Sequence, residues 1–471
     1  MVSFSFSRTY KYPILQVWNW HKNVLALERL TPPWDKITVI KKEDFGNVFL
    51  KDGKITIQQE ILPLIKAKWR ISHMPSMFKE GVSFSDKLVS GPIKKWQHNH
   101  NFIKTSKTQT TIKDEISFSH WINVRKLNNF TLESMEKSFK YRADILEHDL
   151  SNAYKNTNGY YVLITGSSGL VGSALVPLLN SLGYKIVFLK YEKNYKSTSF
   201  NGCKIRYQNK DLIEIPWNPY ISDNLRIPND ISKKIKFVVN LSGENILGIW
   251  TKSKKKLIVK SRLTSTKSLL KVLERNSIRT KCCVHASAVG YYGLNKKLLL
   301  DEYDSSGYGF LAETTKEWEK EQNKFGKLTQ RNVNLRIGAV LSSKGGLIKQ
   351  IELPFKAGLG SFIGKGDNFV NWILLEDLVR IIEKSFNNKD YDGAINAVSP
   401  EPIQSKDLFS LLAKKYKSKF FMNIPSYIPR FFSKELADEI ILSSQQISPK
   451  RLLKNKYKFL APTIHEALDI L

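Results

Sequence analysis

The chain has 471 residues, of which 42% are apolar, enough to build packed cores and to exclude a disordered protein. Its three cysteines, Cys203, Cys282 and Cys283, form neither a disulfide framework nor a Cys-x-x-Cys metal pattern, which is typical of a reducing compartment. The net charge of +31 could attract nucleic acid, but the lysines are scattered along the chain, so we expect no nucleic-acid partner.

Residues 1–155 carry the alternating apolar pattern of antiparallel strands. A helical stretch around Trp18 follows the first strand, and a longer amphipathic segment, 130–150, closes the region. These elements predict an α+β helix-grip domain, which the polar linker 152–158 separates from the rest. The strands are expected at 3–10, 37–40, 48–55, 66–72, 81–89, 96–105 and 108–118.

Two histidines, His98 and His100, alternate along one of these expected strands, so their side chains face the same side. Histidines at this spacing could ligate a metal, but the sequence offers no evident third ligand. We therefore assign no metal site, and expect the pair to line a cavity or to form surface contacts.

A buried strand at 160–165 runs into a Gly-x-x-Gly-x-x-Gly turn and then an apolar helix. Gly166 can adopt positive φ, Gly169 lets the backbone approach a pyrophosphate, and Gly172 lets the helix pack closely on the strand. The helix N-terminus presents N–H groups to phosphate. Because a second strand, 185–189, follows, this βαβ unit predicts dinucleotide binding rather than an ordinary glycine-rich turn.

Strand and helix patterns alternate through residues 160–400, which predicts a Rossmann-like, doubly wound parallel sheet. The last domain, 401–471, is expected to be small and helical. Its Lys- and Phe-rich part, 414–421, could touch a membrane, but a packed amphipathic surface helix is favoured. Further strands are expected at 237–241, 281–286, 333–337 and 394–397, and helices at 254–275, 313–325, 405–416, 434–442 and 463–471.

No apolar run is long enough to span a bilayer, and the N-terminus lacks the continuous apolar region of a signal peptide. We therefore expect no transmembrane segment and a cytoplasmic protein, with an organelle as the alternative location.

Several motifs, in order along residues 160–471, resemble the epimerase branch of the extended or atypical short-chain dehydrogenase/reductase superfamily, whose members are NAD-dependent epimerase/dehydratase-like. The final residues resemble that branch's small C-terminal domain of unknown function. Residues 27–34 and 91–102 are similar to polyketide-cyclase or START-like domains, which implies an apolar small ligand in the N-terminal domain. The epimerase-like motifs are 166–172, 240–246, 250–262, 286–293, 310–313, 335–338, 372–378 and 443–445.

The resemblance implies a nicotinamide cofactor at the carboxyl ends of the strands. Lys190 ends the second strand, where a base accommodates the 2′-phosphate of NADP, although Glu192 could instead bind the ribose 2′-OH of NAD. We therefore expect NADP, with NAD possible. The cofactor residues are expected to be Gly166, Ser167, Ser168, Gly169, Leu170, Val171, Gly172, Lys190, Leu241, Ser242, Gly243, Glu244, Arg262 and Ser287.

The chain lacks the superfamily's helical Tyr-x-x-x-Lys pair, because the corresponding helix offers Phe310. Tyr292 and Lys296 have the spacing, but they lie in a loop after a strand. Arg336, at a strand end, could bind a phosphate or pair with Glu376 or Asp377. The groups left for proton transfer are Ser287, Tyr291, Tyr292 and Glu313.

Glu313 could act as a base only if burial raises its pKa, and its alternative role is a carboxylate favoured at a helix N-terminus. We therefore expect an NADP(H)-binding oxidoreductase of the epimerase/dehydratase type, acting on a small molecule and joined to an apolar-ligand-binding domain. The alternative is a catalytically weak NADP(H)-dependent sensor or scaffold, which the missing Tyr–Lys pair favours.

Overall fold

The computed structural model describes residues 1–43, 53–62, 65–152, 157, 159–193, 206–209, 211–221, 225–294 and 299–471. The chain forms two compact units. The first comprises Met1–Asn158 with Pro177–Tyr184, and the second comprises Gly159–Val176 with Lys185–Leu471. Residues 401–471 belong to the second unit.

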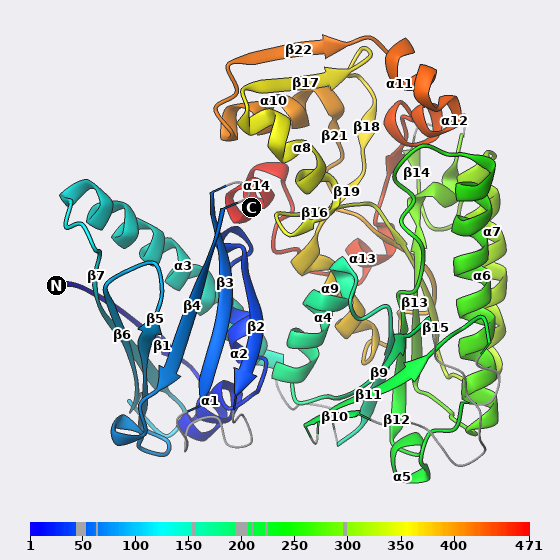
Figure 1. The fold of residues 1–471 in the computed structure, drawn as a ribbon. Coiled ribbons are helices and arrows are strands. Elements are labelled where there is room, and N and C mark those ends of the chain that lie inside the picture. Colours follow the sequence, from blue (N-terminus) through cyan, green and yellow to red (C-terminus); the bar gives the residue numbers. More distant parts are fainter. Residues whose placement is uncertain are drawn as a thin grey trace. The chain divides into compact units, whose positions relative to one another are not determined.

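The first unit is built on a seven-stranded antiparallel sheet in the order β1-β7-β6-β5-β4-β3-β2. Helices α1 (Ile14–His21) and α2 (Ala26–Leu30) follow β1, and α3 (Arg125–Asn152), of 28 residues, closes the unit (Figure 1). The strands are β1 (Val2–Tyr10), β2 (Ile37–Glu43), β3 (Lys54–Leu62), β4 (Ile65–His73), β5 (Ser83–Ser90), β6 (Lys95–Lys104) and β7 (Thr110–Ser119). This is the predicted α+β arrangement, except that β3 begins at Lys54; part of the strand expected at 48–55 lies outside the described residues.

The core of this unit lies between the sheet and its helices. Phe4 and Phe6 point to the same face of β1, and their rings lie 5.4 and 5.7 Å from the ring of Phe139 on α3. Trp18 of α1 is fully buried and meets the ring of Phe102 edge-on at 5.0 Å. These aromatic contacts hold α1 and α3 on one face of the sheet.

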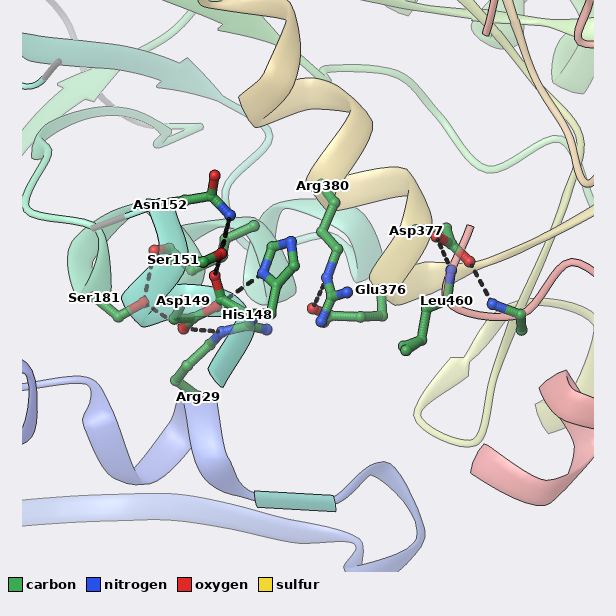
Figure 2. Close-up of polar contacts among 12 residues, drawn as sticks. Arg29, His148, Asp149, Ser151, Asn152, Ser181, Glu376, Asp377, Arg380 and Leu460 are labelled. Carbon is green, nitrogen blue, oxygen red and sulfur yellow. Dashed lines mark hydrogen bonds and ion pairs between the residues drawn. The ribbon is translucent and has the colours of Figure 1, made fainter. Parts of the chain in front are cut away.

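A buried ion pair joins α2 to α3. Arg29 donates hydrogen bonds of 2.8 Å from Nε and Nη2 to the two carboxylate oxygens of Asp149 (Figure 2). Ser181 donates a further hydrogen bond of 2.9 Å to Asp149. Burial alone would raise the pKa of Asp149, but the neighbouring Arg29 lowers it below its usual value.

The second unit is built on an eight-stranded sheet in the order β10-β11-β9-β8-β12-β13-β15-β20. Every neighbouring pair is parallel except β10 with β11, so the expected Rossmann-like parallel sheet is confirmed. The strand order reverses between β8 and β12. The strands are β8 (Tyr161–Thr165), β9 (Lys185–Tyr191), β10 (Arg206–Asn209), β11 (Leu212–Trp217), β12 (Ile235–Asn240), β13 (Cys282–Ala288), β15 (Asn332–Ile337) and β20 (Gly393–Ala397).

Helices cover both faces of this sheet (Figure 1). Val238 of β12 belongs to the same apolar cluster as Leu269 and Leu273 of α6. Its neighbour Phe237 points to the opposite face, where it stacks on Phe386 at 4.6 Å, just after α9. The helices around this sheet are α4 (Leu170–Ser181), α5 (Asn229–Ser232), α6 (Lys252–Arg275), α7 (Phe310–Asn323) and α9 (Leu375–Ser385).

The remaining strands form four two-stranded sheets, three of which join residues 401–471 to earlier parts of the second unit. The pairs are β14 (Leu299–Leu300) with β23 (Gln446–Ile447), β16 (Ala339–Ser342) with β19 (Trp372–Leu374), β17 (Leu359–Ile363) with β22 (Phe420–Ile424), and β18 (Phe369–Val370) with β21 (Ile403–Gln404). The helices here are α8 (Gly346–Lys356), α10 (Ser405–Lys415), α11 (Tyr427–Phe432), α12 (Lys434–Leu436), α13 (Lys450–Lys454) and α14 (Ile464–Ile470).

The run 414–421, expected as an amphipathic helix, instead contains the end of α10 and the start of β22. Residues 401–471 therefore contain strands as well as helices, and three of these strands pair with strands from earlier in the second unit. Among the described residues, no helix combines the length and the apolarity needed to cross a membrane.

Candidate functional site

The glycine-rich turn lies where β8 ends and α4 begins. Gly166 has φ of +72°, and a Cβ on it would lie 2.7 Å from the carbonyl carbon and oxygen of Leu241. A Cβ on Gly172 would lie 2.4 Å from the carbonyl oxygen of Gly166. Side chains are therefore excluded at both positions, because the backbones of the turn, the start of α4 and the residue after β12 lie in close contact.

This turn occupies the point at which the strand order reverses. Thr165, the last residue of β8, donates a hydrogen bond of 2.8 Å to the side chain of Asn240, the last residue of β12. The Leu241 N–H donates to the Thr165 carbonyl at 3.2 Å. Ligands of open parallel sheets bind outside the carboxyl ends of strands at such a reversal, and the first N–H groups of α4 add an anion-binding end.

Gly243, Glu244 and Arg262 meet beyond β12. Arg262 Nη1 donates to the carbonyl oxygens of Glu244 at 3.0 Å and Ile258 at 3.1 Å. Burial lowers the pKa of Arg262 to about 10, and Glu244 partly opposes this shift. The Glu244 carboxylate pairs with Lys254 at 2.9 Å. The Arg262 guanidinium, bound to main-chain oxygens, thus lies beside the loop after β12, where the sequence predicts part of the cofactor site.

At the end of β9, Lys190 donates to Glu214 of β11 at 3.0 Å. The Lys190 side chain is 53% exposed, whereas that of Glu214 is 7% exposed. The Tyr191 ring next to Lys190 lies 6.4 Å from that of Tyr220. The sequence pattern does not predict β11. The pairing of Lys190 with Glu214 on this strand could therefore not be predicted from the sequence.

The Ser287 hydroxyl, on β13, is buried and donates to Glu319 of α7 at 2.6 Å. Glu319 also accepts two hydrogen bonds of 3.0 Å from Nε and Nη2 of Arg336 on β15. Arg336 therefore pairs with neither of the carboxylates suggested by the sequence. Glu376 accepts instead from Arg380 at 2.7 Å.

Tyr292 is completely buried, which does not suit a proton donor that touches substrate. Its hydroxyl accepts a hydrogen bond of 3.0 Å from Arg336 and lies 2.8 Å from the side-chain oxygen of Asn396. Burial raises the pKa of Tyr292 to about 12, although Arg336 works in the opposite direction. Lys296, which has the Tyr-x-x-x-Lys spacing with Tyr292, lies outside the described residues.

Tyr291 is partly exposed, and the guanidinium carbon of Arg336 lies 3.4 Å from the centre of its ring. The Arg336 guanidinium therefore stacks on the Tyr291 ring. Unlike the Tyr292 hydroxyl, the Tyr291 hydroxyl has no hydrogen-bond partner among the described residues. Tyr291 is the tyrosine that the structure leaves available to a substrate.

Glu313 is exposed in the first turn of α7, so it lacks the burial that its expected role as a base requires. Its position is that of the alternative, a carboxylate near a helix N-terminus. Glu439 instead caps this helix, since its two oxygens accept from the N–H groups of Phe310 and Leu311, each at 2.8 Å. No sequence pattern connects Glu439 with a helix that begins more than a hundred residues earlier.

Asp377 anchors the C-terminal segment. It accepts hydrogen bonds from the N–H groups of Leu460 at 2.8 Å and Ala461 at 3.2 Å (Figure 2). Burial raises the pKa of Asp377 to about 6, and the two N–H donors limit the rise. Its role is structural, so the acidic pair at 376–377 is no partner for Arg336.

The strand order, with the glycine turn at its reversal, defines a Rossmann-like α/β protein. Residues 162–396 match the family model described as NAD dependent epimerase/dehydratase family, and residues 424–471 match a domain of unknown function. An epimerase family protein of Mycobacterium bovis is 31% identical over 308 residues, which cover 65% of this chain and 96% of the relative. The chain therefore belongs to the NAD dependent epimerase/dehydratase family.

Other similarities agree with this assignment. An epimerase family protein of Staphylococcus epidermidis is 30% identical over 65% of this chain and 97% of its own length. A nucleoside-diphosphate sugar epimerase structure from Corynebacterium glutamicum has a TM-score of 0.75 and 26% identity, covering 99% of this chain and 89% of that one. The human epimerase family protein SDR39U1, solved with NADPH, has a TM-score of 0.55 and 26% identity, covering 66% and 98%.

Proposed function

We propose that the chain binds NADP(H) in the crevice between the ends of β8 and β12. The observation that carries this proposal is the turn at Gly166–Gly172, where side chains are excluded at Gly166 and Gly172 and the N-terminus of α4 faces the strand-order reversal. When bound, the cofactor would supply hydride transfer between its nicotinamide ring and a substrate carbon. The protein would contribute binding, orientation and proton transfer.

NADP is preferred over NAD because two cations lie near the carboxyl ends of parallel strands. Lys190 is the second-last residue of β9, and Arg262 adjoins the loop after β12. Either could meet a 2′-phosphate. The human relative solved with NADPH supports the same preference. Glu192 remains the residue through which NAD would be bound instead.

The substrate is a small molecule with a carbinol or carbonyl carbon. Nucleoside-diphosphate sugars are the first class to test, since a relative of 26% identity is described as an epimerase of such sugars. Tyr291 would exchange the proton, while Ser287 and Tyr292 would position the site through Glu319 and Arg336. The Glu319–Arg336 pair is the scaffold of this arrangement.

A cofactor-dependent sensor or scaffold is the second candidate. The observation that favours it is the state of the proton-transfer candidates: Tyr292 is buried and held by Arg336, and the Ser287 hydroxyl is taken up by Glu319. Such a protein would bind NADP(H) without turnover. NADPH binding with no oxidation in the presence of carbonyl and sugar-nucleotide substrates would select this candidate.

For the first unit we propose a START-like domain that holds an apolar small molecule. Its seven-stranded sheet and closing helix α3 support this reading, as do the aromatic side chains gathered around Trp18 and Phe102. Saturable binding of a fluorescent fatty acid by the full chain, weakened by Trp18→Ala in a still folded protein, would support it. Failure of the fluorescent fatty acid to bind would remove the support.

The cofactor proposal is tested by fluorescence titration with NADPH and NADH. Gly169→Asp is the test variant, because a Cβ there meets nothing closer than 3.4 Å, while its carboxylate would repel phosphate. Gly326→Asp is the matched control, since a Cβ at Gly326 meets nothing within 4 Å. We expect NADPH-preferring binding that Gly169→Asp abolishes and Gly326→Asp retains. Equal binding by both variants would contradict the proposal.

A further inference from the structure

Five titratable side chains form a row across the first unit's sheet. In the strand register, His73 of β4 lies opposite Asp86 of β5, Asp86 lies opposite His98 of β6, and His100 lies opposite Asp114 of β7. Cross-strand partners share a face of the sheet, and His98 and His100 are two residues apart. All five side chains therefore point to the same face, from four adjacent strands.

Three of these side chains converge on one point. His98 Nε2 lies 2.9 Å and His100 Nδ1 lies 2.7 Å from the same carboxylate oxygen of Asp114. The potential ligand atoms of the three residues all lie within 4.8 Å of one another. Asp114 is thus the third group that the sequence pattern of two alternating histidines does not reveal, because it comes from the neighbouring strand.

The next residues in the row have the arrangement of an outer coordination shell. His100 Nε2, the ring nitrogen that points away from Asp114, lies 3.7 Å from Asp86. Asp86 in turn lies 2.5 Å from His73 Nδ1. Histidines that ligate metals commonly donate their second ring N–H to a carboxylate, which fixes the tautomer and orients the ring.

We propose that His98, His100 and Asp114 form a binding site for a divalent transition-metal ion, with Zn²⁺ as the reference ion. Two imidazole nitrogens and one carboxylate oxygen suit zinc and its first-row neighbours rather than Mg²⁺ or Ca²⁺, which prefer all-oxygen sites. Three protein ligands leave a coordination position open to water or to a bound small molecule. The site is independent of the nucleotide crevice in the second unit.

The surroundings limit access without closing it. The side chains of His98, His100 and Asp114 are 5%, 16% and 12% exposed. The Phe84 ring stacks on His100 at 4.1 Å, and the Phe139 ring of α3 meets His98 edge-on at 5.6 Å. An apolar shell of this kind strengthens the interaction between an ion and its ligands.

Charge balance also admits a cation. Asp86 and Asp114 supply two carboxylates, and the Arg142 guanidinium of α3 interacts electrostatically with Asp114. Burial works to lower the pKa of His100, but Asp114 and Asp86 outweigh it and raise the pKa to about 9. The two carboxylates therefore favour a positive charge at this point, which is where a metal ion would bind.

Proton competition includes every titratable group packed around this point. On the sheet these are His73, Asp86, His98 and Asp114, with His21 from α1 and Arg142 from α3. Burial lowers the pKa values of His21 and His98. Because a metal ion competes with protons for such groups, the affinity should be compared at one fixed pH.

The test is isothermal titration of the EDTA-treated full chain with Zn²⁺ at one fixed pH. We expect one high-affinity equivalent. His98→Gln and Asp114→Asn should each lower the affinity at least about tenfold. His120→Gln is the control, because His120 lies outside the row and contacts Thr131. Near- and far-ultraviolet circular dichroism would verify that each variant is folded.

A second measurement on the wild type does not depend on the variants. Co²⁺ at the site should give visible d–d absorption of a low-symmetry nitrogen and oxygen environment, displaced by one equivalent of Zn²⁺. The proposal is overturned if the wild type takes up no Zn²⁺ tightly, if the His98 and Asp114 variants bind it as well as His120→Gln does, or if Co²⁺ stays octahedral as in water.

Discussion

Glu319 and Arg336 form a bidentate ion pair in which the side chains are 9% and 5% exposed. This pair gathers the polar groups at the carboxyl ends of β13 and β15, because Ser287 donates to the carboxylate and Arg336 donates to the Tyr292 hydroxyl. Burial would lower the pKa of Arg336, but its bonds to Glu319 raise it, so the guanidinium is permanently charged. Whatever chemistry this site performs, it does so around a fixed positive charge.

Removing Glu319 should leave that charge buried without its partner. Glu319→Ala is expected to lower the free energy of unfolding by about 3–5 kcal/mol. Glu317→Ala, in the same helix but with a 56% exposed side chain 4.0 Å from Lys320, should cost no more than about 1 kcal/mol. Urea unfolding of both variants checks this, and equal costs would mean that the ion pair is not a stabilising element.

The two neighbouring tyrosines should separate stability from turnover. Tyr292→Phe removes a hydroxyl that Arg336 and Asn396 contact, so a loss of about 1–3 kcal/mol in unfolding free energy is expected. Tyr291→Phe should leave stability nearly unchanged and lower NADPH oxidation with any substrate found. The two variants are compared by denaturant unfolding and by steady-state kinetics. The assignment fails if Tyr291→Phe keeps full activity.

The close backbone contacts of the glycine turn predict that alanine at Gly172 lowers the stability of the protein more than alanine at Gly326 does. Gly172→Ala places a Cβ 2.4 Å from the Gly166 carbonyl oxygen, so it should destabilise the protein by about 1–3 kcal/mol and weaken NADPH binding. Gly326→Ala meets no atom within 4 Å and should have little effect. Thermal unfolding and NADPH titration of the pair decide this. A stable Gly172→Ala protein with normal binding would contradict the packing described.

Asp377 should give the stability a pH dependence of defined sign. Its pKa rises from 3.8 to about 6 on folding because of burial, so the folded state holds the proton more tightly than the unfolded state. This contribution is fully present below pH 3.8 and is lost as the pH rises to about 6, by up to about 3 kcal/mol.

The measurement for Asp377 is the difference in unfolding free energy between the wild type and Asp377→Asn, followed across this pH window. The wild type should lose stability relative to the variant as the pH rises. Asp469→Asn, at an exposed position of α14, serves as the control and should track the wild type. A difference that grows in the opposite direction would mean that the two N–H donors outweigh burial.

The sequence predicted the parallel sheet well because the strands on both sides of the reversal are continuous apolar runs with a glycine turn between them. It did not predict β11, since Glu214 and Pro216 interrupt its apolar pattern and proline is rare inside sheets. In the structure all six residues of β11 are buried, and Lys190 neutralises Glu214. Tertiary packing therefore overrides the local pattern at this strand.

The candidate sites were partly predictable for a similar reason. The positions of Gly166 and Gly172 follow from a local motif, so the sequence could place the glycine turn at which we propose nucleotide binding. The partners Glu319, Glu439 and Asp114 come from other elements of the fold, and no local spacing connects them with Ser287, Phe310 or His98. Only the strand order and register bring these groups together.

The helix α4 starts at the glycine turn, yet its last residues, from Pro177, group with the first unit, where Ser181 bonds to Asp149. Each unit is therefore discontinuous along the chain. A single cut near residue 158 would yield an N-terminal piece without Ser181 and a C-terminal piece with an unsupported helix end. Dissection of this protein consequently calls for a grafted 177–184 segment or for the intact polypeptide, and simple truncation is a poor guide to what either half can do.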